Sequence, residues 1–213
     1  MIKNRNYNLQ DFREKPDALT NLTEILILNS VKDKNKLCLN YLWDSDIDGM
    51  LDNQTHLVGE LLSHEGQGGL YQTLNQLGYL ESMSTDDNDS FETVVWAFVV
   101  EFTLTDKGIE NWQEVLSIYF KFLEFTLSGV DDLPLFDEIV KMSKMSFNYY
   151  KVPEQLENCE NIASRMQFLA KKPERMNTLL KAAYEETIVE KVDMAQIKTI
   201  LGKLDPVNAK IIL

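Results

Sequence analysis

The sequence predicts an α+β domain in which a layer of helices packs on a mostly antiparallel or mixed sheet. Long segments with an apolar residue at every third or fourth position have the pattern of helices. They alternate with a few short segments rich in β-branched and aromatic residues, which favour strands. No linker rich in proline, glycine and serine divides the 213 residues, so we expect one domain over residues 21–213 after a polar arm at 1–20.

The first apolar segments predict a β-hairpin. Residues 22–28 hold an apolar run suited to a buried strand, and residues 32–35 are polar and suit a turn. Apolar side chains then alternate along residues 37–43, at Leu37, Leu39, Tyr41 and Trp43. A period of two is typical of a half-buried strand, so we expect the two segments to pair.

Two short helices and two strands are expected next. Residues 55–62 place their apolar side chains on one helical stripe, and a second helix runs from 70 to 78 after the glycine-rich break at 66–69. Residues 79–83 predict a short strand and residues 91–104 a long one, rich in strand-forming side chains. Between them lies an acidic run that we interpret as a solvated loop tip rather than a binding patch, formed by Asp86, Asp87 and Asp89.

The second half of the chain predicts mainly helices. Thr105 followed by an acidic residue is a typical helix start, because the hydroxyl accepts a free backbone N–H. A second helix should run to about residue 150, and prolines punctuate the helical region that follows, at Pro153 and Pro173. A last helix is expected over 194–204 and a final strand over 209–213.

Composition and charge exclude several classes of partner. With 21 basic and 34 acidic residues the formal net charge is −13, so a phosphate backbone would be repelled, whereas a basic peptide would be attracted. The longest apolar run has only seven residues, and the N-terminus lacks the apolar core of a signal peptide. Two distant cysteines suit a reducing compartment. We expect a cytoplasmic protein without membrane or nucleic-acid partners.

A search for catalytic chemistry finds no complete site. His56, Glu60 and His64 are four residues apart, and an unbroken helix would place all three on one face able to hold a metal ion. Ordinary hydrogen bonds on a helix surface explain the same spacing. The zinc-protease motifs H-E-x-x-H and H-x-x-E-H are both absent, and consecutive Ser63, His64 and Glu65 cannot form a triad.

Two features bear on binding rather than catalysis. The glycines at 66–69 lack the Lys-Ser/Thr ending of a phosphate loop, so a tight turn explains them better. The short strand that ends in Met83, Ser84 and Thr85 could form a sheet edge. An exposed edge offers unpaired N–H and C=O groups to an extended peptide, although edges are usually covered or solvated.

Three motifs together resemble a known family. Residues 61–70 read Leu-Leu-Ser-His-Glu-Gly-Gln-Gly-Gly-Leu, residues 77–79 read Leu-Gly-Tyr, and residues 102–108 read Phe-Thr-Leu-Thr-Asp-Lys-Gly. Over residues 20–213 this order resembles the insulin-degrading enzyme and pitrilysin branch of the inverzincin family. The likeness is to the second domain of the N-terminal half.

The resemblance implies a function and a cofactor for a longer parent enzyme. Members of the family are zinc metallopeptidases built from four similar α+β domains that enclose peptides in a chamber, and the first domain carries zinc on H-x-x-E-H. This sequence lacks that motif, so the resemblance implies a non-catalytic, metallopeptidase-repeat-like domain without a cofactor of its own. Its implied partners are peptide substrates and the other domains of the same peptidase.

The resemblance also implies a set of substrate-binding residues. In the insulin-degrading branch the second domain has an exosite that anchors the N-terminus of a peptide. Carried over to this sequence, Glu65 would bind the ammonium group while a strand pairs with the peptide. The implied residues are His56, Gly59, Ser63, Glu65, Met83, Ser84 and Thr85. Glu60 stands where the family often has histidine, and Ser63 where it often has glycine.

Three hypotheses therefore remain. The leading one is a fragment of an insulinase-like zinc metalloendopeptidase, which the finish at Leu213 inside a strand-like segment also suggests. The alternative is a free-standing interaction or structural protein that keeps the fold without protease activity. The third is an independent hydrolase that uses His56, Glu60 and His64.

Overall fold

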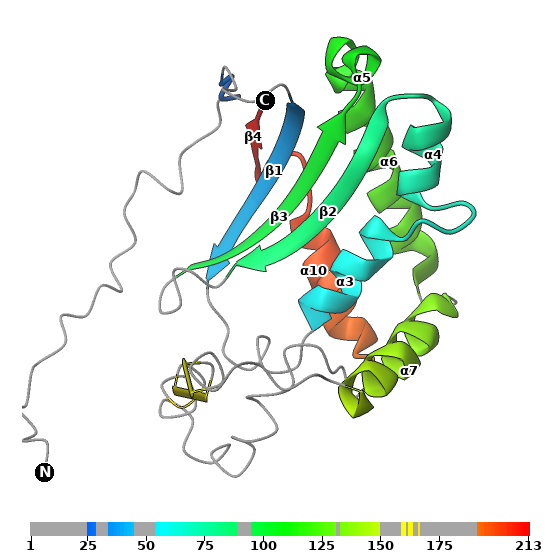
Figure 1. Ribbon diagram of the computed structural model, residues 1–213, viewed down its shortest axis with the longest axis vertical. Coiled ribbons are helices and arrows are strands. Elements are labelled where there is room, and N and C mark those ends of the chain that lie inside the picture. The colour runs from blue at the N-terminus through cyan, green and yellow to red at the C-terminus, as the bar shows by residue number, and fades with distance from the viewer. Residues whose placement is uncertain are drawn as a thin grey trace, which may run out of the picture.

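The computed structural model describes residues 25–28, 34–44, 54–88, 95–130, 133–149, 159–160, 162–163, 166 and 191–213. These residues form an open sheet with helices on one face (Figure 1), which confirms the predicted α+β class. The predicted arm at 1–20, the start of the long strand at 91–94 and most of the helical region after residue 150 lie outside the described residues.

The sheet has four strands in the order β2-β3-β1-β4. Their bounds are Asn35–Asp44 for β1, Leu80–Asn88 for β2, Val95–Leu104 for β3 and Ala209–Ile212 for β4. Every pair of neighbouring strands is antiparallel. β2 is longer than the sequence predicts, because the acidic run does not end the strand: Asp86 and Asp87 pair with Val99 and Phe98.

The predicted hairpin between residues 22–28 and 37–43 is wrong. β1 is a central strand whose two sides are taken by β3 and β4. Residues 25–28 instead add to the outer side of β4, where Leu26 forms a parallel bridge with Ile212. Both partners of β1 are distant in sequence, so local alternation alone could not identify them.

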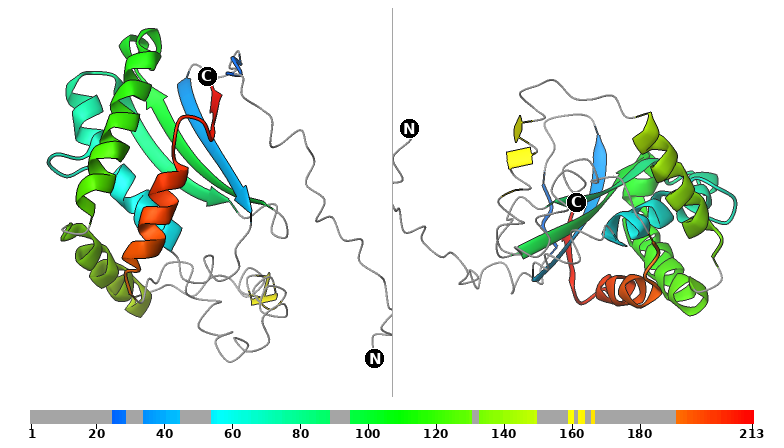
Figure 2. Two further views of the ribbon diagram at one scale, coloured as in Figure 1. Left: turned by 180° about the vertical axis from the view of Figure 1, so that it is seen from behind. Right: turned by 90° about the horizontal axis from the view of Figure 1, so that it is seen from below.

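Six helices have described bounds, and they cover one face of the sheet (Figure 2). They are α3 (Gln54–Ser63), α4 (Leu70–Gln76), α5 (Asp106–Glu110), α6 (Trp112–Gly129), α7 (Leu135–Asn148) and α10 (Met194–Lys203). The helix predicted after Thr105 is split at Asn111, which has non-helical backbone angles. No helix in the described part of the chain is long and apolar enough to span a bilayer.

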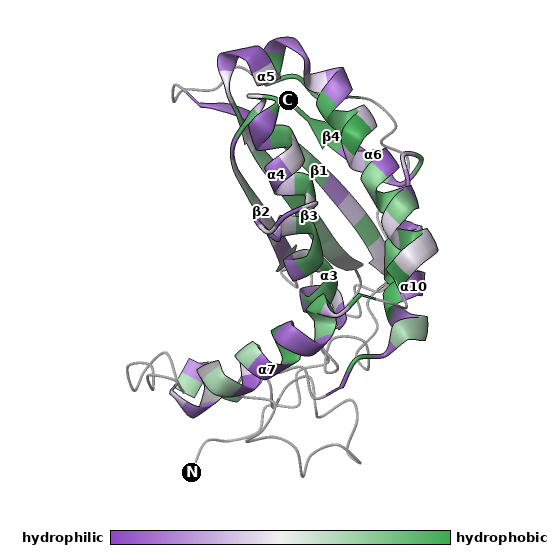
Figure 3. Ribbon diagram, turned by 90° about the vertical axis from the view of Figure 1, so that its right-hand side faces the viewer, coloured by the Kyte–Doolittle hydropathy of each residue, from purple (hydrophilic) through white to green (hydrophobic). Residues whose placement is uncertain are grey.

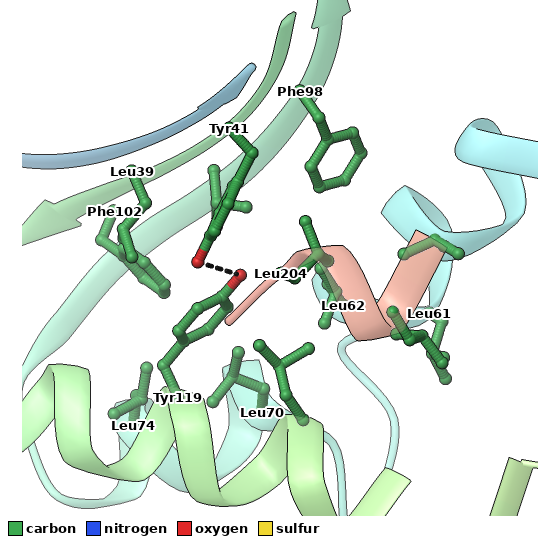
Figure 4. Packing of buried hydrophobic residues seen from close by; sticks show 14 of the residues in the cluster. Leu39, Tyr41, Leu61, Leu62, Leu70, Leu74, Phe98, Phe102, Tyr119 and Leu204 are labelled. Atoms are coloured by element: carbon green, nitrogen blue, oxygen red, sulfur yellow. Dashed lines mark hydrogen bonds between the residues drawn. The ribbon is translucent and has the colours of Figure 1, made fainter. Parts of the chain in front are cut away.

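The core lies between the helices and the sheet (Figure 4). Alternate residues of β1 and β3 point toward the helices and are buried: Leu37, Leu39, Tyr41, Phe98, Val100, Phe102 and Leu104. At its centre the Tyr41 and Tyr119 hydroxyls form a 3.3 Å hydrogen bond, so two phenols are buried without an unpaired oxygen. Figure 3 shows that α3 and the strands behind it are largely hydrophobic, and α3 packs on β2.

Two of the motifs that carry the family resemblance meet at one structural junction. Gly78 has a φ of +73°, a conformation that favours glycine, and its carbonyl accepts a 2.7 Å hydrogen bond from the Thr105 hydroxyl. The same hydroxyl oxygen accepts from the N–H of Gly108 at 3.0 Å and so begins α5. A β-carbon on Gly108 would collide with the carbonyl of Tyr79. These residues therefore fix the chain entering β2 against the chain leaving β3.

Candidate functional site

Hydrogen bonds at the β4 side of the sheet determine where backbone groups point. The Leu26 N–H donates to the Ile211 carbonyl at 3.0 Å, and the Leu213 N–H donates to the Leu26 carbonyl at 2.8 Å. Ile211 and Leu213 therefore direct these groups away from β1. Because successive residues of a strand point their backbone groups to opposite sides, Ile212 must bond to β1, where its partner is Cys38.

The same alternation carries through the sheet to β2. Leu39 follows Cys38, so its backbone groups face β3, where its partner is Val100. Glu101 follows Val100 and faces the other way, toward its β2 partner Ser84. The N–H and C=O of Ser84 thus belong to the sheet. Those of its two neighbours, Met83 and Thr85, point outward.

Within the described part of the chain, these outward groups form an unpaired sheet edge. β2 is the first strand in the order β2-β3-β1-β4, and no described strand lies beyond it. We call the outward backbone groups of Met83 and Thr85 the β2 edge. Two donors and two acceptors spaced two residues apart are what an added strand requires. Of the predicted binding strand, Met83 and Thr85 can thus pair with a peptide through the backbone, whereas Ser84 cannot.

Helix α3 lies directly against this edge strand (Figure 1). Thr85 pairs with Val100, a buried residue on the helix side of the sheet, so its side chain also points toward the helices. A β-carbon on Gly59 would lie 2.7 Å from the Thr85 Oγ1 atom. The absence of a side chain at Gly59 therefore lets α3 approach β2, and the structure brings these two predicted residues into contact.

The remaining predicted residues of α3 line its less buried side. His56 and Ser63 are partly buried, and Glu60 between them is exposed. The Ser63 hydroxyl donates a 2.9 Å hydrogen bond to the carbonyl of Gly59. This bond turns the hydroxyl back onto the helix, so Ser63 crowds the adjoining space less than its replacement of glycine suggests.

Glu65 lies in a tight turn built by three glycines. A β-carbon on Gly66 would collide with the His64 imidazole, and one on Gly69 would lie 2.5 Å from the His64 carbonyl oxygen. Gly68 has a φ of +83°, and its N–H donates to the Gln72 side chain at 2.8 Å. The turn thus closes around His64 and leaves Glu65 exposed next to it. The tight-turn interpretation of this segment is confirmed.

The metal hypothesis fails on geometry. α3 ends at Ser63, so His64 lies outside the helix and cannot stack on one face with His56 and Glu60. In the described ranges no three His, Cys, Asp or Glu side chains are grouped as metal ligands. His56, Glu60 and His64 therefore do not form a zinc site.

Comparison with known proteins finds relatives of this chain. Insulin-degrading enzyme-like 2 of Arabidopsis thaliana is 25% identical over 211 residues, which cover 99% of this chain and 21% of that protein. Protease 3 of Salmonella typhimurium is 29% identical over 155 residues, covering 73% of this chain and 15% of that protein. These similarities confirm the predicted resemblance to the insulinase and pitrilysin family. No family model matches it.

Solved structures agree with the fold of this chain. The crystal structure of pitrilysin superposes with a TM-score of 0.75 at 20% identity, over 88% of this chain and 19% of that one. An inactive peptidase domain from Bordetella parapertussis superposes with a TM-score of 0.54 at 13% identity, over 86% of this chain and 91% of that domain. The chain thus spans about a fifth of its full-length relatives and matches nearly the whole of an isolated domain.

Proposed function

We propose that this chain is the second, non-catalytic domain of an insulinase-like zinc metalloendopeptidase. In that role it forms part of the wall that encloses a peptide and binds the peptide in extended form. The single observation that supports this role best is the unpaired β2 edge, with the backbone groups of Met83 and Thr85 pointing outward. Catalytic zinc and the chemistry of peptide cleavage then belong to another domain of the longer protein.

Binding at the β2 edge proceeds by strand addition. The backbone of an extended peptide supplies complementary N–H and C=O groups, which bond to Met83 and Thr85 regardless of sequence. A peptidase that encloses many different peptides gains from such a mode, because the backbone is common to all of them. α3 forms one wall beside the edge, since Gly59 lets it approach Thr85.

Glu65 anchors the peptide's N-terminus in this proposal. Its side chain is exposed at the start of the glycine turn that follows α3. An α-ammonium group has three donors and a positive charge, so a carboxylate recognises it through charge-assisted hydrogen bonds. Acetylation removes that charge and two of the donors. A peptide with a free N-terminus should therefore bind more tightly than its acetylated form.

A peptide titration tests both parts of the proposal. We would measure, by fluorescence anisotropy, the affinity of the 213-residue chain for one labelled peptide with a free or an acetylated N-terminus. Glu65→Ala should weaken binding of the free peptide about tenfold, as expected for a charged hydrogen bond, and leave the acetylated peptide unchanged. Glu110→Ala removes an exposed carboxylate from α5 and should change neither. Equal losses for both peptides would rule out the ammonium anchor.

A further inference from the structure

The charge of the chain is concentrated in one stretch of sequence. Residues 37–106 contain 13 acidic residues and no lysine or arginine, so they account for the whole net charge of −13. Outside this stretch, the 21 lysines and arginines of the chain balance the remaining 21 acidic residues. Residues 37–106 contain β2, which forms the edge, together with α3, α4 and β3, which contact it.

Several carboxylates of this stretch are exposed around the edge. They lie on α3, in the glycine turn and along β2, at Glu60, Glu65, Glu81 and Asp86. The two lysines that bound the stretch are occupied elsewhere. The Lys36 Nζ atom forms an ion pair with Glu101 at 2.5 Å, and the Lys107 Nζ donates to the Leu77 carbonyl at 2.7 Å. Neither therefore neutralises the carboxylates beside the edge.

Successive side chains of a peptide added to β2 would point to opposite faces of the sheet, and each face exposes carboxylates. Residues of a peptide opposite Met83 and Thr85 share their orientation and point toward the helices. On that side α3 exposes Glu60, the residue next to the one that touches Thr85. The peptide residues between them point to the opposite face, where β2 exposes Ser84 and Asp86. Two consecutive peptide residues thus each have a carboxylate on their own side.

We propose that the β2 edge selects basic peptides, with Glu60 as the specificity-determining residue on the helix side and Asp86 assisting on the other face. This inference rests on the proposed function, because it assumes an extended peptide at the edge. An exposed ion pair changes an affinity by about two- to fivefold, so each carboxylate makes a moderate contribution. The unbalanced field of the whole stretch also speeds the encounter with cationic peptides at low ionic strength.

Three peptides of one length, each with a free N-terminus, test the inference. One carries two consecutive lysines at its centre, one carries uncharged residues there, and one carries two glutamates. The 213-residue chain should bind them with decreasing affinity in that order. The advantage of the lysine peptide should shrink as salt rises from about 50 mM to about 500 mM, because salt screens exposed charges.

Variants separate local recognition from net charge. Glu60→Gln should weaken binding of the lysine peptide about two- to fivefold and leave the affinity for the uncharged peptide unchanged. Glu110→Gln removes the same charge from α5 and should affect the lysine peptide less. Glu60→Lys should reverse the preference toward the glutamate peptide. Both positions are exposed, and circular dichroism would verify that the three variants keep the fold.

Different outcomes would contradict the selection of basic peptides and peptide binding itself. Equal affinity for the lysine and uncharged peptides, or equal effects of Glu60→Gln and Glu110→Gln, would overturn the selection of basic peptides while peptide binding itself stands. Failure of every peptide to bind would overturn both proposals.

Discussion

Gly59 on α3 faces Thr85 on β2 so closely that a β-carbon at Gly59 would lie 2.7 Å from the Thr85 Oγ1 atom. This contact joins a helix to the free strand of the sheet. It holds α3, whose less buried side carries His56, Glu60 and Ser63, against the strand that carries the outward backbone groups of Met83 and Thr85. The candidate site therefore depends on a packing relationship between two residues that are distant in sequence.

Gly59→Ala should destabilise the fold, although alanine favours a helix. The added methyl must displace the Thr85 side chain, and overpacking of this kind costs about 1–3 kcal/mol, more than the helix propensity gained. Thr85→Ala should relieve the collision, since the next atom, the Thr85 β-carbon, is at an ordinary 3.5 Å. Urea unfolding of both single variants and the double variant measures this coupling.

A matched control for that series is Gly202→Ala on α10, where a β-carbon would meet nothing within 4 Å. It should gain about 0.5 kcal/mol from helix propensity. If Gly59→Ala were equally stabilising, the close approach of α3 to β2 would be refuted.

Proline substitutions at neighbouring positions of β2 should behave differently. Thr85→Pro removes an N–H that points away from the sheet, so the fold should survive while peptide affinity falls about tenfold. Ser84→Pro removes an N–H that bonds to β3 and should cost about 2–3 kcal/mol of unfolding free energy. Thermal unfolding and peptide titration of the two variants measure the contrast. The opposite pattern would show that the register assigns the wrong residues to the edge.

The buried pair of tyrosines should make stability sensitive to alkali. Burial raises the pKa of both Tyr41 and Tyr119 above the usual value near 10. The folded state therefore favours the protonated phenols. Their contribution to the free energy of unfolding is complete below about pH 10 and is lost as the pH rises further. Urea unfolding from about pH 8 to about pH 11 should show this loss in the wild type and a smaller one when both are phenylalanine.

Tyr119→Phe alone should cost about 1–3 kcal/mol, because it leaves the buried Tyr41 hydroxyl without its partner. Replacing both tyrosines removes the unpaired group and should cost less than twice that amount. Additive losses at neutral pH would indicate that the hydrogen bond contributes little.

The Cys38 thiol should react slowly with alkylating reagents. Burial, and the Glu101 carboxylate beside it, raise the pKa of Cys38 to about 11. At pH 8 the thiol is therefore almost fully protonated, and alkylation by iodoacetamide should be about a hundredfold slower than at the exposed Cys159. Glu101→Gln should lower the pKa of Cys38 and speed its reaction. Mass spectrometry of the two peptides over time would measure both rates, and equal rates in the wild type would contradict the account.

Strong local patterns predicted most of the elements correctly. The apolar stripe of α3, the Thr105 cap and the alternation along β1 each depend on residues close in sequence, so they could be recognised without a structure. The hairpin prediction failed because β1 pairs with β3 and β4, and partner choice depends on long-range packing. The acidic run stayed within β2 because Asp86 at the free edge keeps its carboxylate exposed, so extending the strand buries no charge there.

The residues of the candidate site came from the family resemblance, whereas their geometry comes from the structure. The resemblance implied Gly59 and Thr85, and the glycine motif pointed to a turn at Glu65. Which residues of β2 present their backbone outward could not be predicted, since it depends on a hydrogen-bond register carried across four strands from Leu26. The close approach of Gly69 to the His64 carbonyl oxygen is likewise visible only in three dimensions.

Amide hydrogen exchange along β2, resolved by residue with NMR, is the measurement that tests strand addition at the β2 edge. We predict that the amides of Met83 and Thr85 exchange rapidly in the free chain and become protected when a saturating peptide is added. The amide of Ser84, already bonded to β3, should be protected in both states. Unchanged exchange at Met83 and Thr85 in the presence of a bound peptide would contradict strand addition at the β2 edge.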